Sequence, residues 1–470
     1  MTSKSSPVSL FSSVQIDATY VIVAVVGLLP MILLALIGKP MFALAIPLAV
    51  MVAFLLLNPR ITFWLLLISL FVYAPQRIGA TFAVHPFDLI MGLLYAGIVL
   101  EYLLKFKQGL KFSPFDAPFI ILLLATVISM VFAYNISYAI VPCIRIFVIY
   151  LAFRAVFTYG QIIGVRKIIN VYLWLVALNG AYNITLFIWQ GGQERVFGPA
   201  YLGYETFSMT ALPMAAAFML WAQSTRQRIL YGSLAIMIGL GIVATQARGP
   251  LLAVAIAVPL LIFFAARKSK RESNRSRSHL LKLIFIPAVA LIALVFLLKD
   301  SLFVGLFSRY EEMLVSLTNP KGTIALRLIL WETAIRTFLD NPITGIGIGN
   351  FRLVHHIYPD LKLMPLHWWI FGMSAHNVLL HYLAETGIVG FLALVTLSWK
   401  GLRHSYKGFM QKLSYPDNQA AAALLIAMVV FCVTILFMRA WTWGQGGYVM
   451  ALLFGLLAAS GETRKIKQLK

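Results

Sequence analysis

The sequence predicts an all-α, polytopic membrane protein: a transmembrane helical bundle of 12–14 spans with one large, partly helical external loop. Three observations predict this fold. Hydrophobic residues make up 61% of the 470 residues and charged residues only 11%, a composition that a soluble domain cannot bury. Apolar segments approach the roughly 20 residues needed to cross a bilayer. A single long polar segment, residues 299–375, interrupts them.

The apolar segments lie near residues 18–38, 41–57, 61–74, 86–103, 115–134, 138–158, 168–189, 204–222, 228–246, 250–266, 281–298, 376–398, 419–437 and 446–460. The second and third are short for full crossings, so we interpret them as tilted or partly re-entrant segments. Counting them as two spans gives 14, and discounting them gives 12. Either number leaves both termini on the same side of the membrane.

The formal charge of +22 sets the orientation. A basic run between Arg267 and Arg277 is a short loop between apolar segments, and such loops are cytoplasmic. Alternation from this loop places both termini and most Lys and Arg residues in the cytoplasm. The short external loops hold only Lys39, Arg77, Arg195 and Arg439. The positive charge therefore reflects membrane topology, and we predict no nucleic-acid partner.

These patterns divide the chain into N-terminal transmembrane helices (1–298), the large external loop (299–375) and C-terminal transmembrane helices (376–470). Within the loop, residues Arg309–Leu317 and Thr323–Leu339 have the periodicity of amphipathic helices. Asn341-Pro342 predicts a turn, and the glycines at 345, 347 and 349 predict a tight, extended loop. Their spacing differs from that of a dinucleotide-binding fingerprint.

Arginines close to the bilayer need a partner or a purpose. Arg195, Arg248, Arg327 and Arg336 all fall on the predicted external face. Guanidinium groups bind phosphate oxygens in a bidentate geometry, so converging arginines would suit a pyrophosphate. The alternative is that they form ordinary ion pairs, Arg195 with Glu194 or Glu205 and Arg327 with Glu332 or Glu311.

His376 and Asn377 begin the apolar segment that follows the loop, and the alternatives for His376 are a proton-transfer role or a capping or interfacial role. A histidine at this boundary is placed to exchange a proton between a substrate and water. The sequence shows no metal-ligand spacing, and Cys143 and Cys432 lie inside apolar segments. We therefore predict neither a metal site nor a disulfide.

These residues resemble the bacterial O-antigen ligases and the related O-antigen and exopolysaccharide polymerases. The ligase motif is His, then Asn, Ser or Gln, nine residues, Gly, two residues, and Gly, Thr or Tyr. It is matched by His376-Asn377, Gly387 and Gly390. The Arg-x-x-x-Leu motif is matched by Arg248–Leu252, and the arginine of the large loop by Arg327. The resemblance extends over about residues 190–400; after Arg195 the chain lacks the Gly-Asn-Pro-Asn type segment of many relatives.

The resemblance implies a membrane glycosyltransferase of the bacterial inner membrane whose site faces the periplasm. The donor would be a glycan on polyprenyl pyrophosphate, and the acceptor a sugar hydroxyl of a lipid A-core or a similar glycan. His376 would be the catalytic base, Arg248, Arg327 and Arg195 would bind pyrophosphate, and Asn377 and Arg336 would support them. Because the donor is already activated, neither a cofactor nor a metal is implied.

Three functions stay open at this point. A ligase and a repeat-unit polymerase would use the same residues, and Arg336 with Gly347 also fits a polymerase-type Arg-x10-Gly pattern. Glycan profiles distinguish them, because loss of chain-length ladders indicates a polymerase and polymer that never reaches the core indicates a ligase. The third function is a lipid-linked glycan flippase or transporter, which predicts inverted repeats, and the sequence shows none.

Overall fold

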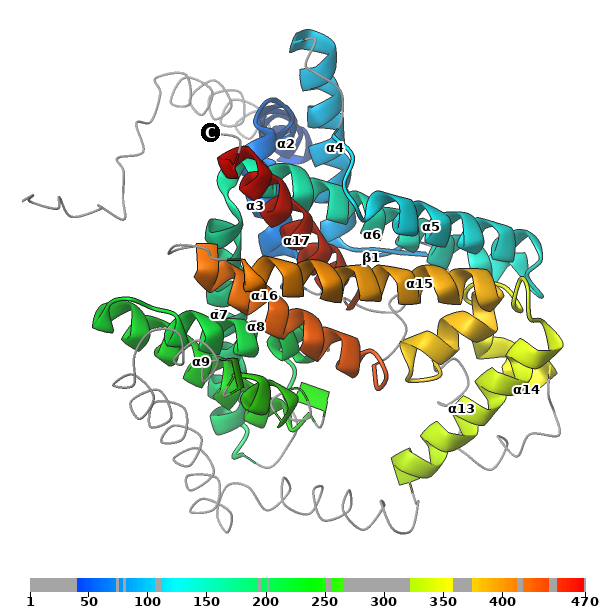
Figure 1. The fold of residues 1–470 in the computed structure, drawn as a ribbon. Coiled ribbons are helices and arrows are strands. Elements are labelled where there is room, and N and C mark those ends of the chain that lie inside the picture. Colours follow the sequence, from blue (N-terminus) through cyan, green and yellow to red (C-terminus); the bar gives the residue numbers. More distant parts are fainter. Residues whose placement is uncertain are drawn as a thin grey trace, which may run out of the picture. The chain divides into compact units, whose positions relative to one another are not determined.

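The computed structural model describes residues 40–72, 76–78, 82–105, 111–192, 196–200, 203–247, 249–250, 253, 255–261, 263–264, 322–357, 374–411, 417–438 and 446–468. Apart from one hairpin, its regular elements are helices (Figure 1). The elements are α2 (Pro40–Leu57), α3 (Pro59–Ser69), β1 (Gln76–Ile78), β2 (Phe82–Val84), α4 (Pro86–Lys105), α5 (Asp116–Val131), α6 (Ile136–Ile163), α7 (Val165–Trp189), α8 (Gly203–Leu220), α9 (Thr225–Thr245), α13 (Gly322–Asp340), η1 (Phe351–Leu353), α14 (Val354–Ile357), α15 (Val378–Met410), α16 (Asp417–Thr434) and α17 (Gly446–Gln468). Residues 249–264 are also helical where they are described.

The chain divides into two compact units, with boundaries inside α3 and α4. The described part of the first unit is residues 40–65 and 92–105, and the second unit contains the remaining described residues. In the second unit, β1 and β2 form an antiparallel hairpin in which Arg77 pairs with Ala83. All residues of the candidate site that the structure describes belong to the second unit.

The all-α, membrane-spanning fold class is confirmed. Six helices among the described residues are long and apolar enough to cross a membrane, or seven if one bent pair counts as a span. That pair is Leu48–Leu57 and Pro59–Ser69, which meet at 109°. The pair corresponds to the two short segments predicted near 41–57 and 61–74, and its bend is that of a broken or re-entrant span. The apolar segments near 18–38 and 281–298 lie outside the described residues.

Two arginines within the helices of the second unit have carboxylate partners, as arginines in apolar surroundings require. Arg145 of α6 lies 3.0 Å from Asp88 and also bonds to the hydroxyl of Tyr448. Arg154, farther along α6, lies 2.8 Å from the buried Asp116. Asp88 and Arg145 therefore neutralise each other within the helices.

Small residues let α6 and α17 approach closely. A Cβ atom at Gly160 of α6 would overlap Ala459 of α17, and one at Gly455 of α17 would overlap Val156 of α6. Helix association inside a bilayer depends on this close packing because lipid removes the hydrophobic driving force. The pair forms part of the scaffold on which α5 and α15 lie.

Helix α15 runs antiparallel to α5 (Figure 1). Ser129, near the end of α5, bonds to Glu385 near the start of α15, whereas Phe115 at the other end of α5 packs on His404. The start of α6 lies at the same end as Glu385, because the backbone N–H of Asn135 donates to Asn350 in the segment that precedes α15. This end of the bundle carries the candidate site.

The predicted amphipathic helix at Thr323–Leu339 is confirmed as α13, which extends over Gly322–Asp340. Its buried side chains Leu326, Leu330 and Ala334 belong to an apolar cluster with Ile346, Phe351, Val354, Ala375 and Ala384. The predicted glycine loop follows, and Gly345, Gly347 and Gly349 all have positive φ angles. The helix predicted at Arg309–Leu317 lies outside the described residues.

The glycine loop enters a break in α15. At Gly387 the backbone leaves the helical conformation, with φ 63° and ψ −163°. The carbonyl groups of Ala384 and Glu385 accept hydrogen bonds from Ile346 N (3.1 Å) and Gly347 N (3.1 Å), and Ile388 N donates to Pro342 O (2.9 Å). Residues 342–347 thereby satisfy backbone groups that an unbroken helix would pair internally.

We predict that Gly387→Ala destabilises the protein by at least about 2 kcal/mol, because only glycine tolerates this backbone conformation. An added Cβ would also overlap the carbonyl oxygen of Ile343. Thermal unfolding of the detergent-solubilised protein measures the effect. Gly239→Ala is the matched control, since that glycine lies in α9 with nothing within 4 Å of an added Cβ. Equal melting temperatures for the two variants would contradict the prediction.

Candidate functional site

The predicted catalytic base lies just before α15. The helix begins at Val378, so His376 precedes it and does not occupy its first turn, a correction to the start predicted from apolar pattern alone. Asn377 is the N-cap: its side chain accepts a hydrogen bond from Leu380 N at 3.1 Å. Val378 N donates to Ile435 O at 2.9 Å, which ties this helix start to the segment after α16.

His376 has a left-handed backbone conformation, with φ 51°. Such a conformation costs about 1 kcal/mol or more for a residue with a side chain, and it concentrates at functional sites. Among the described residues only Gln246 shares a positive φ without being glycine (φ 49°). Gln246 ends α9 two residues before Arg248. One of these two residues, His376, is thus itself a predicted site residue, and the other, Gln246, lies close to the predicted site residue Arg248.

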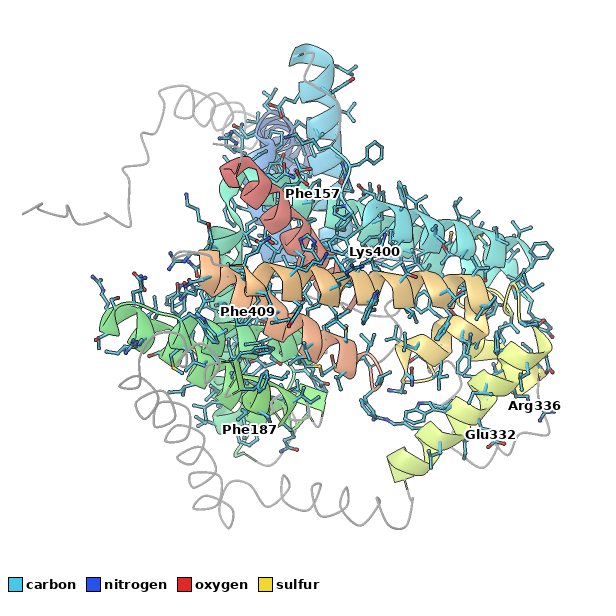
Figure 2. All side chains as sticks on the ribbon, in the orientation of Figure 1. Phe157, Phe187, Glu332, Arg336, Lys400 and Phe409 are labelled. Atoms are coloured by element: carbon cyan, nitrogen blue, oxygen red, sulfur yellow. The ribbon has the colours of Figure 1, made fainter. Side chains whose placement is uncertain are left out.

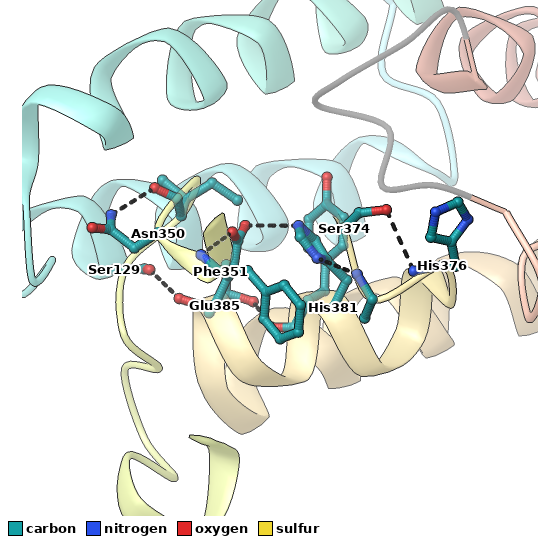
Figure 3. Close-up of polar contacts among 11 residues, drawn as sticks. Ser129, Asn350, Phe351, Ser374, His376, His381 and Glu385 are labelled. Carbon is teal, nitrogen blue, oxygen red and sulfur yellow. Dashed lines mark hydrogen bonds and ion pairs between the residues drawn. The ribbon is translucent and has the colours of Figure 1, made fainter. Parts of the chain in front are cut away.

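The side chain of His376 is half-buried and extends away from the interior cluster around Glu385 (Figure 3). Its backbone N lies 3.4 Å from the hydroxyl of Ser374. The backbone of the turn that carries the imidazole is therefore hydrogen-bonded to a buried side chain.

Of the four predicted arginines, the structure describes Arg327 and Arg336, both on α13. They are nine residues apart, which at about 3.6 residues per turn places them on opposite sides of the helix. Arg327 is half-buried and follows Leu326, which packs in one cluster with Ala375. Arg336 is exposed, as is Glu332 (Figure 2). The side chains of Arg195 and Arg248 lie outside the described residues.

A buried pair in α15, His381 and Glu385, was missed from the sequence. Their exposed fractions are 1% and 0%. His381 Nε2 lies 3.1 Å from Glu385 Oε2, a close polar contact inside the protein. Buried polar groups need partners, and each of these two atoms lies within reach of the other. The signal was available: residues four apart share a helix face.

Glu385 connects the helix to the segment after the glycine loop. Its Oε1 accepts a hydrogen bond from Phe351 N at 2.9 Å (Figure 3). The backbone oxygen of Glu385 accepts from Ser129 Oγ at 2.5 Å. Three separate parts of the chain, in α5, η1 and α15, therefore meet at this residue.

Arg352 is a further cation close to this buried pair that the sequence analysis missed. Its guanidinium lies 5.2 Å from the centre of the Tyr138 ring. Burial lowers the pKa of Arg352, and the electrostatic interactions with Tyr138 and Glu385 act in the opposite direction. An arginine remains charged despite such a shift, so the site end of the bundle gains a fixed positive charge.

Two residues of the His-Asn…Gly…Gly pattern have structural roles in addition to Asn377. Gly387 forms the break in α15. Gly390 leaves space for Thr386, whose hydroxyl donates to Tyr382 O at 2.6 Å. In the pattern, the remaining residue is His376, for which the sequence predicts proton transfer. Among the described residues, no group of three His, Cys, Asp or Glu side chains could hold a metal ion.

Residues 232–395 match the family model described as O-antigen ligase. The resemblance found in the sequence over about residues 190–400 is thereby confirmed for this region. The matched region, residues 232–395, includes Arg248, Arg327, Arg336, His376 and Asn377, whereas Arg195 lies outside it. No curated protein matches the chain at a significant level.

We predict that Asn377→Ala lowers stability by about 1 kcal/mol, the usual effect of removing an N-cap acceptor. Asn377→Asp should retain most of the stability because its carboxylate can accept the same hydrogen bond from Leu380 N. Chemical denaturation of the two purified variants tests this. A loss of equal size in both would contradict the capping role.

Proposed function

We propose that this chain transfers a glycan from polyprenyl pyrophosphate to a sugar hydroxyl of a lipid A-core or similar acceptor. The observation that carries the proposal is the position of His376. It occupies a left-handed turn at the start of α15, inside the region that matches the O-antigen ligase family. This membrane enzyme would work in the inner membrane, with both termini in the cytoplasm and its site facing the periplasm.

His376 would act as the general base. Its neutral imidazole would take the proton of the acceptor hydroxyl while that oxygen forms a bond to the anomeric carbon. The bond from the anomeric carbon to the pyrophosphate oxygen breaks in the same step, and polyprenyl pyrophosphate leaves with the bonding electrons. A single displacement inverts the configuration at the anomeric carbon.

Arginines would stabilise the negative charge that grows on the leaving pyrophosphate. Arg327 is supported by its half-buried position on α13, next to the cluster that contains Ala375. Arg248 is supported by its place in the family match. Arg195 and Arg336 remain proposed contributors, and the reaction would need neither a metal nor a cofactor.

A repeat-unit polymerase is the second candidate function. The glycine of the Arg336-x10-Gly347 pattern lies in the loop that bonds to the break in α15, so the pattern has a structural counterpart in the site. The chemistry would be the same, but the acceptor would be a second lipid-linked glycan. Purified protein given lipid A-core and a lipid-linked repeat separates the two functions by its product.

We predict that His376→Ala lowers the rate of glycan transfer at least about 100-fold, the usual contribution of a general base. Transfer is measured with purified protein, lipid-linked donor and acceptor, with and without chelator. His404→Gln is the matched control, because His404 lies at the far end of the same helix beside Phe115. Unchanged transfer by His376→Ala would refute the base assignment, and loss of activity with chelator would refute metal independence.

We predict that Arg327→Ala weakens donor binding about 10-fold or more, whereas Arg327→Lys recovers only part of it. Lysine keeps the charge but loses the bidentate geometry. Titration with the lipid-linked donor measures the change. Arg403→Ala, which removes an exposed arginine from α15, should leave the affinity unaltered. Full affinity in Arg327→Ala would contradict the pyrophosphate role.

A further inference from the structure

His381 and Glu385 are too deeply buried to touch a substrate, with exposed fractions of 1% and 0%. Nevertheless, a hydrogen bond and a close polar contact connect them to the turn that carries His376. Ala375 N donates to His381 Nδ1 at 3.3 Å, and His381 Nε2 faces Glu385 at 3.1 Å. The chain of contacts from Glu385 to the backbone next to His376 thus passes through one imidazole ring (Figure 3).

The contacts determine where His381 carries its proton. Nδ1 accepts a hydrogen bond from the Ala375 backbone, so it must be unprotonated, and in a neutral ring the proton is then on Nε2. Nε2 faces a carboxylate oxygen, which accepts hydrogen bonds and cannot donate one when ionised. Glu385 therefore favours the tautomer that the Ala375 backbone requires.

Glu385 faces N–H donors at both of its oxygens. Oε1 receives the N–H of Phe351 and Oε2 faces Nε2 of His381. A glutamine at this position would present one oxygen and one NH2 group, so one of the two neighbouring N–H groups would face another donor. A carboxylate is the side chain of this length that satisfies both neighbours.

We propose that His381 and Glu385 are positioning residues that hold the Ser374–Asn377 turn and so orient His376 toward the acceptor hydroxyl. Through Phe351, they also link the orientation of His376 to the segment that follows the glycine loop. This inference rests on the proposed function, in which His376 is the base. It assigns no direct contact with substrate to either residue.

Two substitutions at His381 separate positioning from stability. In His381→Asn, the side-chain oxygen can replace Nδ1 and accept from Ala375 N, but Glu385 loses its partner. In His381→Gln, the side chain can replace Nε2 beside Glu385, but Ala375 N loses its acceptor. A buried carboxylate oxygen without a donor is a more destabilising defect than an unpaired backbone N–H, so His381→Asn should be the less stable protein.

The positioning role predicts the opposite order for activity. We expect kcat to fall about 10- to 100-fold in His381→Gln, the effect of misplacing a catalytic group, and to fall by much less in His381→Asn. KM for the donor should stay near its original value in both. Unfolding and initial transfer rates are measured on the same preparations, with His404→Gln as control. Activities that follow the order of stabilities, or equal kcat values, would overturn the proposal.

A double-variant cycle distinguishes this inference from the proposed function. If His381 acts through His376, then adding His381→Gln to His376→Ala should change the remaining rate by less than about 2-fold. A full-sized additional loss in that background would overturn the positioning role alone. A normal rate for His376→Ala by itself would overturn the base assignment and, with it, the route through His376.

Discussion

The break in α15 at Gly387 is the constraint on which the site end of the protein depends. A helix that stops pairing its own backbone inside an apolar region leaves polar groups that must be satisfied by protein. Here the partners come from residues 342–347, and Ser129 of α5 adds another. The loop and α5 are therefore both joined to backbone carbonyl groups of α15, and the side chains of the site surround these hydrogen bonds.

This arrangement explains why two histidines five residues apart differ so much. His376 lies before the helix, in a left-handed turn, and its ring is half-buried. His381 lies one turn inside the helix and is fully enclosed by Phe351, Glu385 and the Ala375 backbone. In the proposed mechanism, the ring of His376 exchanges a proton with a ligand and the ring of His381 holds the protein around it. Apolar surroundings strengthen the interior contacts, because unpaired polar groups there are costly.

Much of the fold could be predicted from sequence because its signals are local. Apolar length predicted the membrane helices, amphipathic period predicted α13, and Asn341-Pro342 with three glycines predicted the turn and loop. The destination of that loop could not be predicted, since its partners Ala384 and Glu385 lie about 40 residues farther along the chain. The start of α15 was misplaced because His376 and Asn377 border an apolar run, and only the capping geometry shows that the helix begins at Val378.

The candidate site was predicted in part for the same reason. Motif spacing proposed His376 and the arginines as site residues, but it gave Gly387 no structural role and passed over His381 and Glu385. A buried pair of this kind is defined by contacts with Phe351 and Ala375, which no local pattern reveals. Helical geometry could relate Arg327 to Arg336, yet the side of α13 that packs on the protein is known only from the apolar cluster it joins.

The hydrogen bonds at the break in α15 limit which insertions and deletions this part of the chain tolerates. These hydrogen bonds connect backbone atoms of Pro342, Ile346 and Gly347 with those of Ile388, Ala384 and Glu385. Backbone hydrogen bonds depend on the number of residues between the paired groups and depend little on which side chains those residues carry. Inserting or deleting one residue between Pro342 and Ile346 would change the spacing between the Pro342–Ile388 pair and the other two pairs, so that all three could not form together, while every amino acid of the site was retained. Segment length is therefore as much a part of this site as its histidine.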